Sequence, residues 1–207
     1  PSTAPHLSLE EAQREKNDAL CRSLRLAPTD HVLEIGTGWG SMAIYAAVHY
    51  GCRVTTTTLS REQFAYTQRR IEEQGLRERI TLLLEDYRDL DGQYDKLVSI
   101  EMIEAVGDEF WPTYFQTLDA RLAPGGKICV QAILMDHDRY LATRNSFGWI
   151  QKYIFPGGLL PSTEAILGIT GDQTSLRTVD MYSLRPHYAE TLRLWRERFT
   201  ANRDAVS

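Results

Sequence analysis

The sharpest chemical signal in the sequence is the glycine-rich segment EIGTGWG, which runs from Glu34 to Gly40. It follows a short apolar run and precedes an alanine-rich segment of helical character. Glycines at these positions allow a tight turn and a close approach of the backbone to a ligand. The N-terminus of the following helix would add unpaired N–H groups and the positive end of a dipole. The segment therefore predicts a nucleotide-like ligand at the turn.

Three interpretations of this segment are open. A dinucleotide site requires the spacing GxGxxG and an acidic residue about 20 positions later. Here the third glycine comes one residue early, and residues 55–59 hold no carboxylate. A loop for a methyl donor, (D/E)xGxGxG, begins with an acid and fits Glu34, Gly36 and Gly38, which would hold the methionine end and the ribose. The third interpretation is a glycine-rich turn that binds no ligand.

Two further strand ends carry polar groups. Asp86 closes the third predicted strand and can accept a hydrogen bond from an adenine amino group, although a lone Asp is more often a turn residue. The fourth strand runs through Ile100 into polar residues, which suits the reactive end of a donor. Because ligands bind at the carboxyl ends of parallel strands, three strand ends converge on one site of nucleoside size. This convergence favours S-adenosylmethionine as the ligand.

Strands alternate with helices along most of the chain. Strands are predicted at residues 32–35, 53–59, 80–84, 96–100 and 128–134, and helices at residues 7–24, 41–50, 60–74, 110–122 and 188–202. This alternation indicates right-handed βαβ units and an α/β fold with a Rossmann-like, doubly wound, mostly parallel sheet. Ser8 and Ser60 are the expected N-terminal caps of two helices.

One segment breaks the alternation, because residues 136–165 are rich in aromatic and turn residues. We expect these residues to form an insertion that covers the active site of a single domain spanning residues 1–207. Residues 174–184 are expected to pair late in the sheet.

The composition excludes several classes of protein. A net charge of −5 argues against nucleic-acid binding as the main purpose. The three cysteines, Cys21, Cys52 and Cys129, form no CxxC spacing, which argues against a disulfide framework or a zinc site. No apolar run approaches the ~20 residues of a membrane span, and no signal peptide is recognised. We therefore expect a cytoplasmic protein.

Beyond these patterns, the sequence resembles the cyclopropane fatty acid synthase and mycolic acid cyclopropane synthase family over residues 7–203. The resemblance rests on the segments LSLEEAQREK, EIGTGWGSMA, TTTTLSREQ, EDYRDLDGQYDKLVSIEMIEAVG, KYIFPGGLLPS and PHYAETLRLW. It implies a class I methyltransferase that uses S-adenosylmethionine, and a substrate with a cis double bond in a fatty acyl chain, usually on a phospholipid. It also implies a donor site made of Gly36, Gly38, Thr58, Leu59, Gln63, Asp86 and Tyr87, to which Glu34 and Ile100 are added from the strand ends.

The family's reaction centre holds a bicarbonate ion that acts as a base. The matching positions here are Glu104, Gln131, the backbone of Ile133 and Tyr188. This chain has Gln131 and Ala105 where the family often has His, and it lacks an upstream YSCxY-like segment; downstream family segments are also expected to be absent. The pattern is closer to a subgroup associated with methyl-branched or methylene fatty acids than to the members that form cyclopropanes.

The chemistry assigns tasks to these side chains. Methyl transfer to an alkene leaves a carbocation, which an anionic or aromatic surround stabilises, and a base must then remove a proton. We hypothesise that Glu104 orients or replaces this base, that Gln131 orients bicarbonate or Glu104, and that Tyr188 binds the partner oxygen. The alternatives are structural: a carboxylate that caps a turn, a buried amide, and an aromatic ring in the core.

Partners follow from the same resemblance. The aromatic segment 147–155, with Leu159 and Leu160, is expected to line an acyl channel, or else to cap the sheet. Five arginines near the C-terminus suit anionic head groups at the inner membrane face, or else form a solvated helix face: Arg185, Arg193, Arg196, Arg198 and Arg203. A reductase partner and a homo-oligomer are further expectations. The alternative functions are a small-molecule N- or O-methyltransferase and a non-catalytic binding protein.

Overall fold

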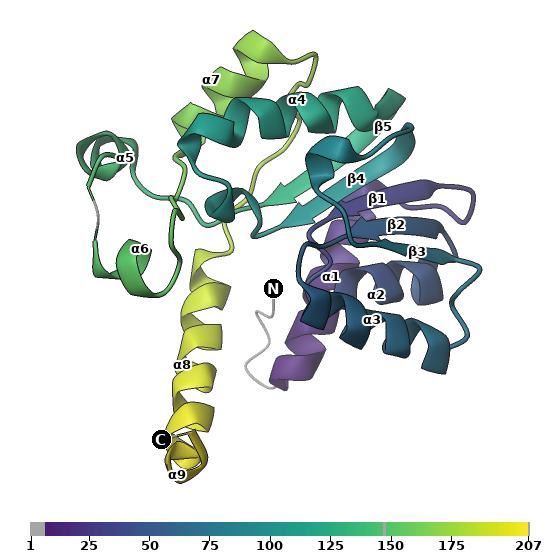
Figure 1. Cartoon of the computed structure of the whole chain (residues 1–207), viewed down its shortest axis with the longest axis horizontal. Coiled ribbons are helices and arrows are strands. Elements are labelled where there is room, and N and C mark those ends of the chain that lie inside the picture. The colour runs from purple at the N-terminus through teal and green to yellow at the C-terminus, as the bar shows by residue number, and fades with distance from the viewer. Residues whose placement is uncertain (1–6, 147, 207) are drawn as a thin grey trace.

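A computed structural model describes residues 7–146 and 148–206 and contains one parallel sheet of five strands. The strands are β1 (His31–Ile35), β2 (Arg53–Thr57), β3 (Ile80–Leu83), β4 (Tyr94–Ile100) and β5 (Leu122–Gln131). Their order is β3-β2-β1-β4-β5, and every neighbouring pair is parallel (Figure 1). The predicted doubly wound sheet is confirmed. The strand order reverses between β1 and β4, which is where such sheets bind ligands.

Helices cover both faces of the sheet. Three helices lie on one face: α1 (Leu9–Leu24), α2 (Ser41–Tyr50) and α3 (Arg61–Glu73). On the other face lie α4 (Trp111–Arg121) and α7 (Thr163–Gln173). Each layer has its own apolar cluster, one around Leu20, Ala46 and Val54 and the other around Trp111 and Leu118. The sheet is therefore fixed from both sides, as parallel sheets require.

The predicted helix starts are confirmed. Ser8 and Glu11 form a reciprocal capping box at α1, because each side chain bonds to the backbone of the other residue. The Ser60 side chain accepts a hydrogen bond from Gln63 N at the start of α3.

Two strand predictions need correction. The strand expected at residues 128–134 begins earlier, at Leu122, and contains Pro124, Gly125 and Gly126 as an irregularity: Tyr94 pairs with Leu122, and Lys96 pairs with Lys127. The fifth strand also ends at Gln131, three residues earlier than expected.

Residues 174–184, all of them described, form no strand, so their expected pairing in the sheet is wrong. Ser175 explains where the segment goes instead, since its N and Oγ atoms both donate to the Asp119 carboxylate on α4. This contact fixes the start of the segment on α4. A β-branched pattern becomes a strand only where its surroundings supply a pairing partner.

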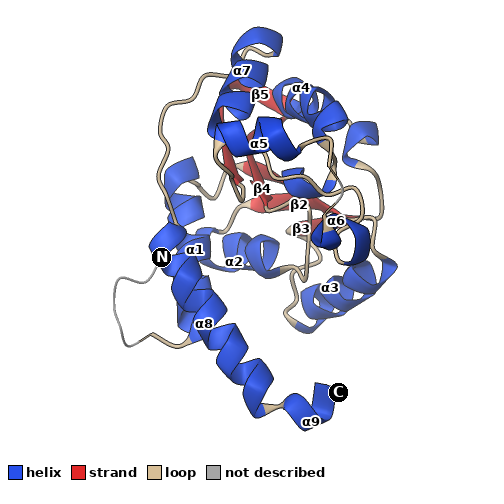
Figure 2. Ribbon diagram, turned by 90° about the vertical axis from the view of Figure 1, so that its left-hand side faces the viewer, coloured by secondary structure: helices blue, strands red, loops and turns tan. Residues whose placement is uncertain are grey.

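The remaining elements lie beyond the carboxyl ends of β4 and β5 (Figure 1). They are the short helices α5 (His137–Thr143) and α6 (Trp149–Tyr153) of the predicted insertion, and the C-terminal helices α8 (Arg185–Ala201) and α9 (Arg203–Val206). Phe147, part of the expected acyl channel, lies outside the described residues. Helix α8 extends away from the body of the molecule (Figure 2). No helix in the described part of the chain combines the length and apolarity that crossing a bilayer requires.

Candidate active site

The glycine turn between β1 and α2 has an open side. Gly36, Gly38 and Gly40 all have positive φ angles, of 96°, 52° and 78°, which L-residues with a side chain rarely adopt. A Cβ atom built on Gly38 meets no atom within 4 Å, whereas one on Gly40 lies 2.5 Å from Thr67 Cγ2 on α3. The third glycine therefore permits close packing of α2 and α3, while Gly38 leaves its backbone open to a ligand.

Glu34 lies beneath this turn and is 2% exposed. Its Oε2 accepts a hydrogen bond of 2.6 Å from Thr56 Oγ1, and Thr56 Oγ1 lies 2.7 Å from Thr37 Oγ1. Burial raises the pKa of Glu34 to about 8, so the carboxyl is mostly protonated at neutral pH. The predicted donor residue thus also connects the turn to β2.

The second strand end presents Thr58, Leu59 and Gln63 at the same edge. Thr58 Oγ1 donates to Gln63 Oε1 over 2.8 Å, and Ser60 N donates to Thr58 Oγ1 over 3.1 Å. Leu59 is 68% exposed, so its side chain is accessible to a ligand at this edge. These contacts preform the loop that precedes α3.

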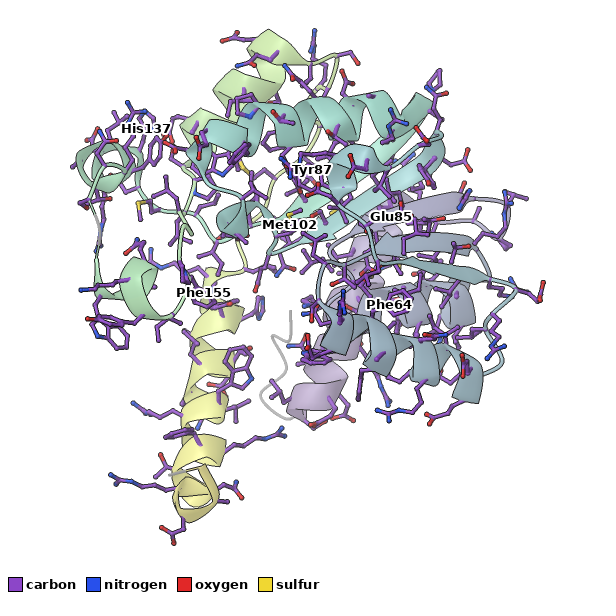
Figure 3. The ribbon with its side chains drawn as sticks, viewed as in Figure 1. Phe64, Glu85, Tyr87, Met102, His137 and Phe155 are labelled. Atoms are coloured by element: carbon purple, nitrogen blue, oxygen red, sulfur yellow. The ribbon has the colours of Figure 1, made fainter. Side chains whose placement is uncertain are left out.

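The third strand end places Tyr87 near Met102 at the carboxyl edge (Figure 3), and Asp86 precedes Tyr87 in the chain. Arg88 donates to both carboxylate oxygens of Asp86, over 2.9 and 2.8 Å, and holds the pKa of Asp86 below its ordinary value. Asp86 is therefore an ionised acceptor at neutral pH. Tyr87 is buried and packs edge-to-face on Tyr114, with the ring centroids 5.7 Å apart.

Glu104 lies in the 3₁₀ turn η2 (Ile103–Ala105), which follows β4. Its Oε1 accepts a hydrogen bond of 2.5 Å from Ile133 N, so the structure brings together two of the predicted residues. Its Oε2 is buried and has no hydrogen-bond partner among the described residues. Burial also raises the pKa of Glu104. A buried acceptor without a partner indicates a place for a ligand or a proton.

Gln131 and Tyr188 both bond to a carboxylate other than Glu104, which was one of the two groups that Gln131 was expected to orient. Gln131 Nε2 donates to Glu101 Oε1 over 2.8 Å, and the Tyr188 hydroxyl donates to Glu101 Oε2 over 3.4 Å. Burial, followed by the Glu101 charge, raises the pKa of Tyr188. Gln131 Oε1 is a second buried acceptor that lacks a partner within the described residues.

Glu101 is the residue that the sequence analysis missed. It follows β4 directly and has a φ angle of 50°, which is unfavourable for a residue with a side chain. Lys16 on α1 interacts electrostatically with both Glu101 and Glu34, although its pKa is lowered, mainly by burial. The available signal was a carboxylate at the end of a buried central strand, next to the expected reaction centre.

Bicarbonate does not fit this arrangement. The expected donors are Ile133 N–H, the Gln131 amide and the Tyr188 hydroxyl, and each already donates to a carboxylate of the chain itself. The acceptors left over, Glu104 Oε2 and Gln131 Oε1, could accept only the single O–H of bicarbonate and offer no donor to its charged oxygens. An added anion would also lie beside two carboxylates.

A sulfonium nucleoside fits better, for two reasons. Its positive charge is attracted by Glu101 and Glu104, and the open face at Gly38 leaves room for its backbone contacts. The carboxyl edge of the sheet thus combines a cradle for a cationic nucleoside with a carboxylate pair.

Comparison with known proteins covers almost the whole chain. The family model described as mycolic acid cyclopropane synthetase matches residues 3–207. The tuberculostearic acid methyltransferase UfaA1 of Mycobacterium tuberculosis (strain ATCC 25618 / H37Rv) is 55% identical over 199 residues, which are 96% of this chain and 46% of that protein. The cyclopropane-fatty-acyl-phospholipid synthase of Escherichia coli (strain K12) is 39% identical over 194 residues, which are 94% of this chain and 48% of that protein.

Solved structures agree with these matches. The crystal structure of mycolic acid cyclopropane synthase CmaA1 complexed with SAH and CTAB matches with a TM-score of 0.88 and 28% identity, over 97% of this chain and 73% of that one. The predicted class I methyltransferase fold is therefore confirmed. The chain spans about half the length of the curated relatives that it matches.

Proposed function

Because this chain belongs to the mycolic acid cyclopropane synthetase family, we propose that it transfers the methyl group of S-adenosylmethionine to the cis double bond of an unsaturated fatty acyl chain. The observation that carries the proposal is the carboxylate pair Glu101 and Glu104 at the same sheet edge as the open glycine turn. We propose a phospholipid as the carrier of the acyl chain.

The donor supplies an electrophilic methyl group, and the protein supplies the surroundings. Glu34, Gly36, Gly38 and Ile100 would hold the methionine end, Thr58, Leu59 and Gln63 the ribose side, and Asp86 and Tyr87 the adenine. The alkene electron pair would form the new C–CH₃ bond while the S–CH₃ bond of the donor breaks and S-adenosylhomocysteine leaves with the sulfur electron pair, so the neighbouring carbon becomes positive. Glu101 and Glu104 would stabilise that carbon by their charge, and a bound acyl chain that excludes water would strengthen this effect.

The proton then needs a base, and we assign this role to Glu101. Its two oxygens are oriented by Gln131 and Tyr188, whereas Glu104 is held by Ile133 N and has a raised pKa. Loss of a proton from the new methyl group closes a cyclopropane ring. A hydride shift followed by proton loss from the same carbon gives a methylene group. In either case Glu101 is protonated at the end of the reaction and then releases the proton to solvent.

We propose the methylene or methyl-branched product. Gln131 and Ala105 support this choice, as they replace histidines that are frequent in the family, and so does the 55% identity to a tuberculostearic acid methyltransferase. A methylene group must be reduced to become a methyl branch, so a reductase partner would complete the reaction.

The test is direct. The protein is incubated with S-adenosylmethionine and vesicles of an oleoyl phospholipid, and the released fatty acids are identified by mass spectrometry. We expect a product that is heavier by one CH₂ and that carries a methylene group. A cyclopropane would overturn the product assignment, and no lipid product from a protein that binds the donor would overturn the substrate assignment.

A further inference from the structure

Helix α6 and the two residues after it expose an unusual amount of apolar surface. Five side chains within seven positions are at least half exposed, namely Trp149 (66%), Ile150 (56%), Tyr153 (59%), Ile154 (50%) and Phe155 (65%). Single exposed apolar residues are common on soluble proteins, but a contiguous patch usually marks an interaction surface. We call these five residues the α6 patch. Each of its side chains is at least half exposed, so the described part of the expected acyl channel is open to solvent.

The α6 patch is connected directly to the reaction centre. The chain that leaves it bonds to the turn carrying the Glu104 carboxylate, because Leu159 N donates to Glu104 O over 2.9 Å. Gly158 allows this approach, because a Cβ built on it would lie 3.1 Å from Phe155 O and 3.4 Å from Glu104 O. Phe155 lies at the end of α6 that faces the body of the molecule (Figure 3).

The charges around the α6 patch favour an anionic partner. Residues 139–163 contain three basic side chains and no Asp or Glu, in a chain with 28 acidic and 23 basic residues. These three, Arg139, Arg144 and Lys152, are all exposed. Lys152 Nζ lies 5.1 Å from the centre of the Tyr153 ring. Aromatic residues beside basic ones are typical of segments that lie in the interface of a bilayer.

The C-terminal arginines are a weaker candidate for the same contact. Arg193 is paired with Glu190 and Glu197 on α8, and Arg198 is paired with Glu10 on α1. Their charge is therefore partly balanced within the chain, which supports the solvated helix face over the head-group site.

We propose that the α6 patch inserts into the surface of an anionic phospholipid bilayer. The inference rests on the proposed function, since the contact would let an acyl chain pass from the bilayer to Glu101 and Glu104 without crossing water. The apolar side chains supply the insertion, and Arg139, Arg144 and Lys152 supply attraction to phosphate groups.

The experiment compares two double variants by sedimentation with phosphatidylglycerol vesicles and with phosphatidylcholine vesicles. Trp149→Ser/Phe155→Ser changes the α6 patch. Trp195→Ser/Phe199→Ser is the matched control, because these two aromatic side chains on α8 are also largely exposed. We expect the first variant to bind phosphatidylglycerol vesicles about tenfold or more weakly than the parent. The control should stay within about twofold, and the parent should prefer the anionic vesicles.

Further measurements separate the possible failures. Donor affinity by calorimetry should be the same in both variants as in the parent. Equal vesicle binding by the parent and the α6 variant would overturn the proposal, and so would a loss confined to the α8 variant. A parent that sediments as a dimer, and an α6 variant that does not, would assign the patch to a second copy instead. Vesicle binding by the patch without any methylated lipid would leave the docking surface intact and overturn the proposed function.

Discussion

At the scale of single residues, the decisive feature is a carboxylate in a strained position. The left-handed conformation of Glu101 costs about 1–2 kcal/mol relative to an ordinary one. Gln131 and Tyr188 donate hydrogen bonds to the Glu101 carboxylate and hold it in place. Strain of this kind persists where the surroundings overdetermine a residue, and it clusters at functional sites.

Replacing Glu101 should separate strain from chemistry. Glu101→Gly relieves the strain, and Glu101→Gln keeps it, but neither variant has a carboxylate at this position to accept a proton. We expect both to lower lipid turnover about a hundredfold or more, while the free energy of unfolding of Glu101→Gly stays within about 1 kcal/mol of the parent or above it. Product analysis and urea titration measure the two effects.

The parent and Glu101→Gln also test whether the reaction needs bicarbonate. Turnover of the parent should be unchanged in buffer freed of carbon dioxide, because Glu101 already occupies the donors that an anion would need. Full activity of Glu101→Gln, or a parent that requires added bicarbonate, would contradict the assignment.

Buried Glu34 predicts a pH dependence of stability. Its pKa is raised from 4.5 to about 8 in the folded protein, so the folded state keeps a proton that the unfolded state releases. Stability should therefore fall as the pH rises from about 4.5 to about 8, by an amount on the order of a few kcal/mol. Glu34→Gln should flatten this slope in urea titrations at several pH values. An unchanged slope in the variant would show that Glu34 is not the group responsible.

At the scale of elements, the glycine turn both leaves room for a ligand and lets two helices pack closely, and the sequence does not show which glycine does which. Gly38 faces open space, and Gly40 lies against Thr67. Gly38→Ala should cost about 1 kcal/mol for its positive φ angle, as should the control Gly75→Ala, which also has open surroundings. Only Gly38→Ala should also lower donor affinity in calorimetry, about tenfold or more, through loss of the close backbone approach.

Gly40→Ala provides the contrast. A methyl group 2.5 Å from Thr67 Cγ2 must push α2 and α3 apart, so this variant should lose about 2–4 kcal/mol of unfolding free energy. If Gly38→Ala bound the donor as tightly as Gly75→Ala does, the assignment of Gly38 to the donor site would be wrong.

Most elements could be predicted because their signals are local. The capping box of Ser8 and Glu11 marks the start of α1, and the apolar runs mark the buried strands. The fate of residues 174–184 is not a local property, since it depends on whether a strand edge or Asp119 is nearer. Glu104 and the Ile133 backbone were predicted through the family resemblance, whereas Glu101 was missed because its partners lie 30 and 87 residues away.

At the scale of the whole molecule, α8 carries Tyr188 to the site with little support of its own. None of the described residues of α8 is buried, and its long-range contacts include the Tyr188 hydrogen bond to Glu101 and the ion pair of Arg198 with Glu10. Exposed ion pairs contribute little. The position of Tyr188 therefore depends on a weakly anchored element.

This weak anchoring predicts that α8 opens locally. Amide hydrogens of residues 190–200 should exchange about a hundredfold or more faster than those of β1 and β4, because few buried contacts oppose their opening. Donor and lipid together should slow exchange in α8, since a filled site strengthens the contact between Tyr188 and Glu101, and Tyr188→Phe should lose part of that protection. Hydrogen-exchange mass spectrometry of the parent and the variant, with and without both ligands, measures this. An α8 as protected as β4 in the free protein would mean that the helix is held by contacts stronger than these two, and Tyr188 would then be a fixed part of the site.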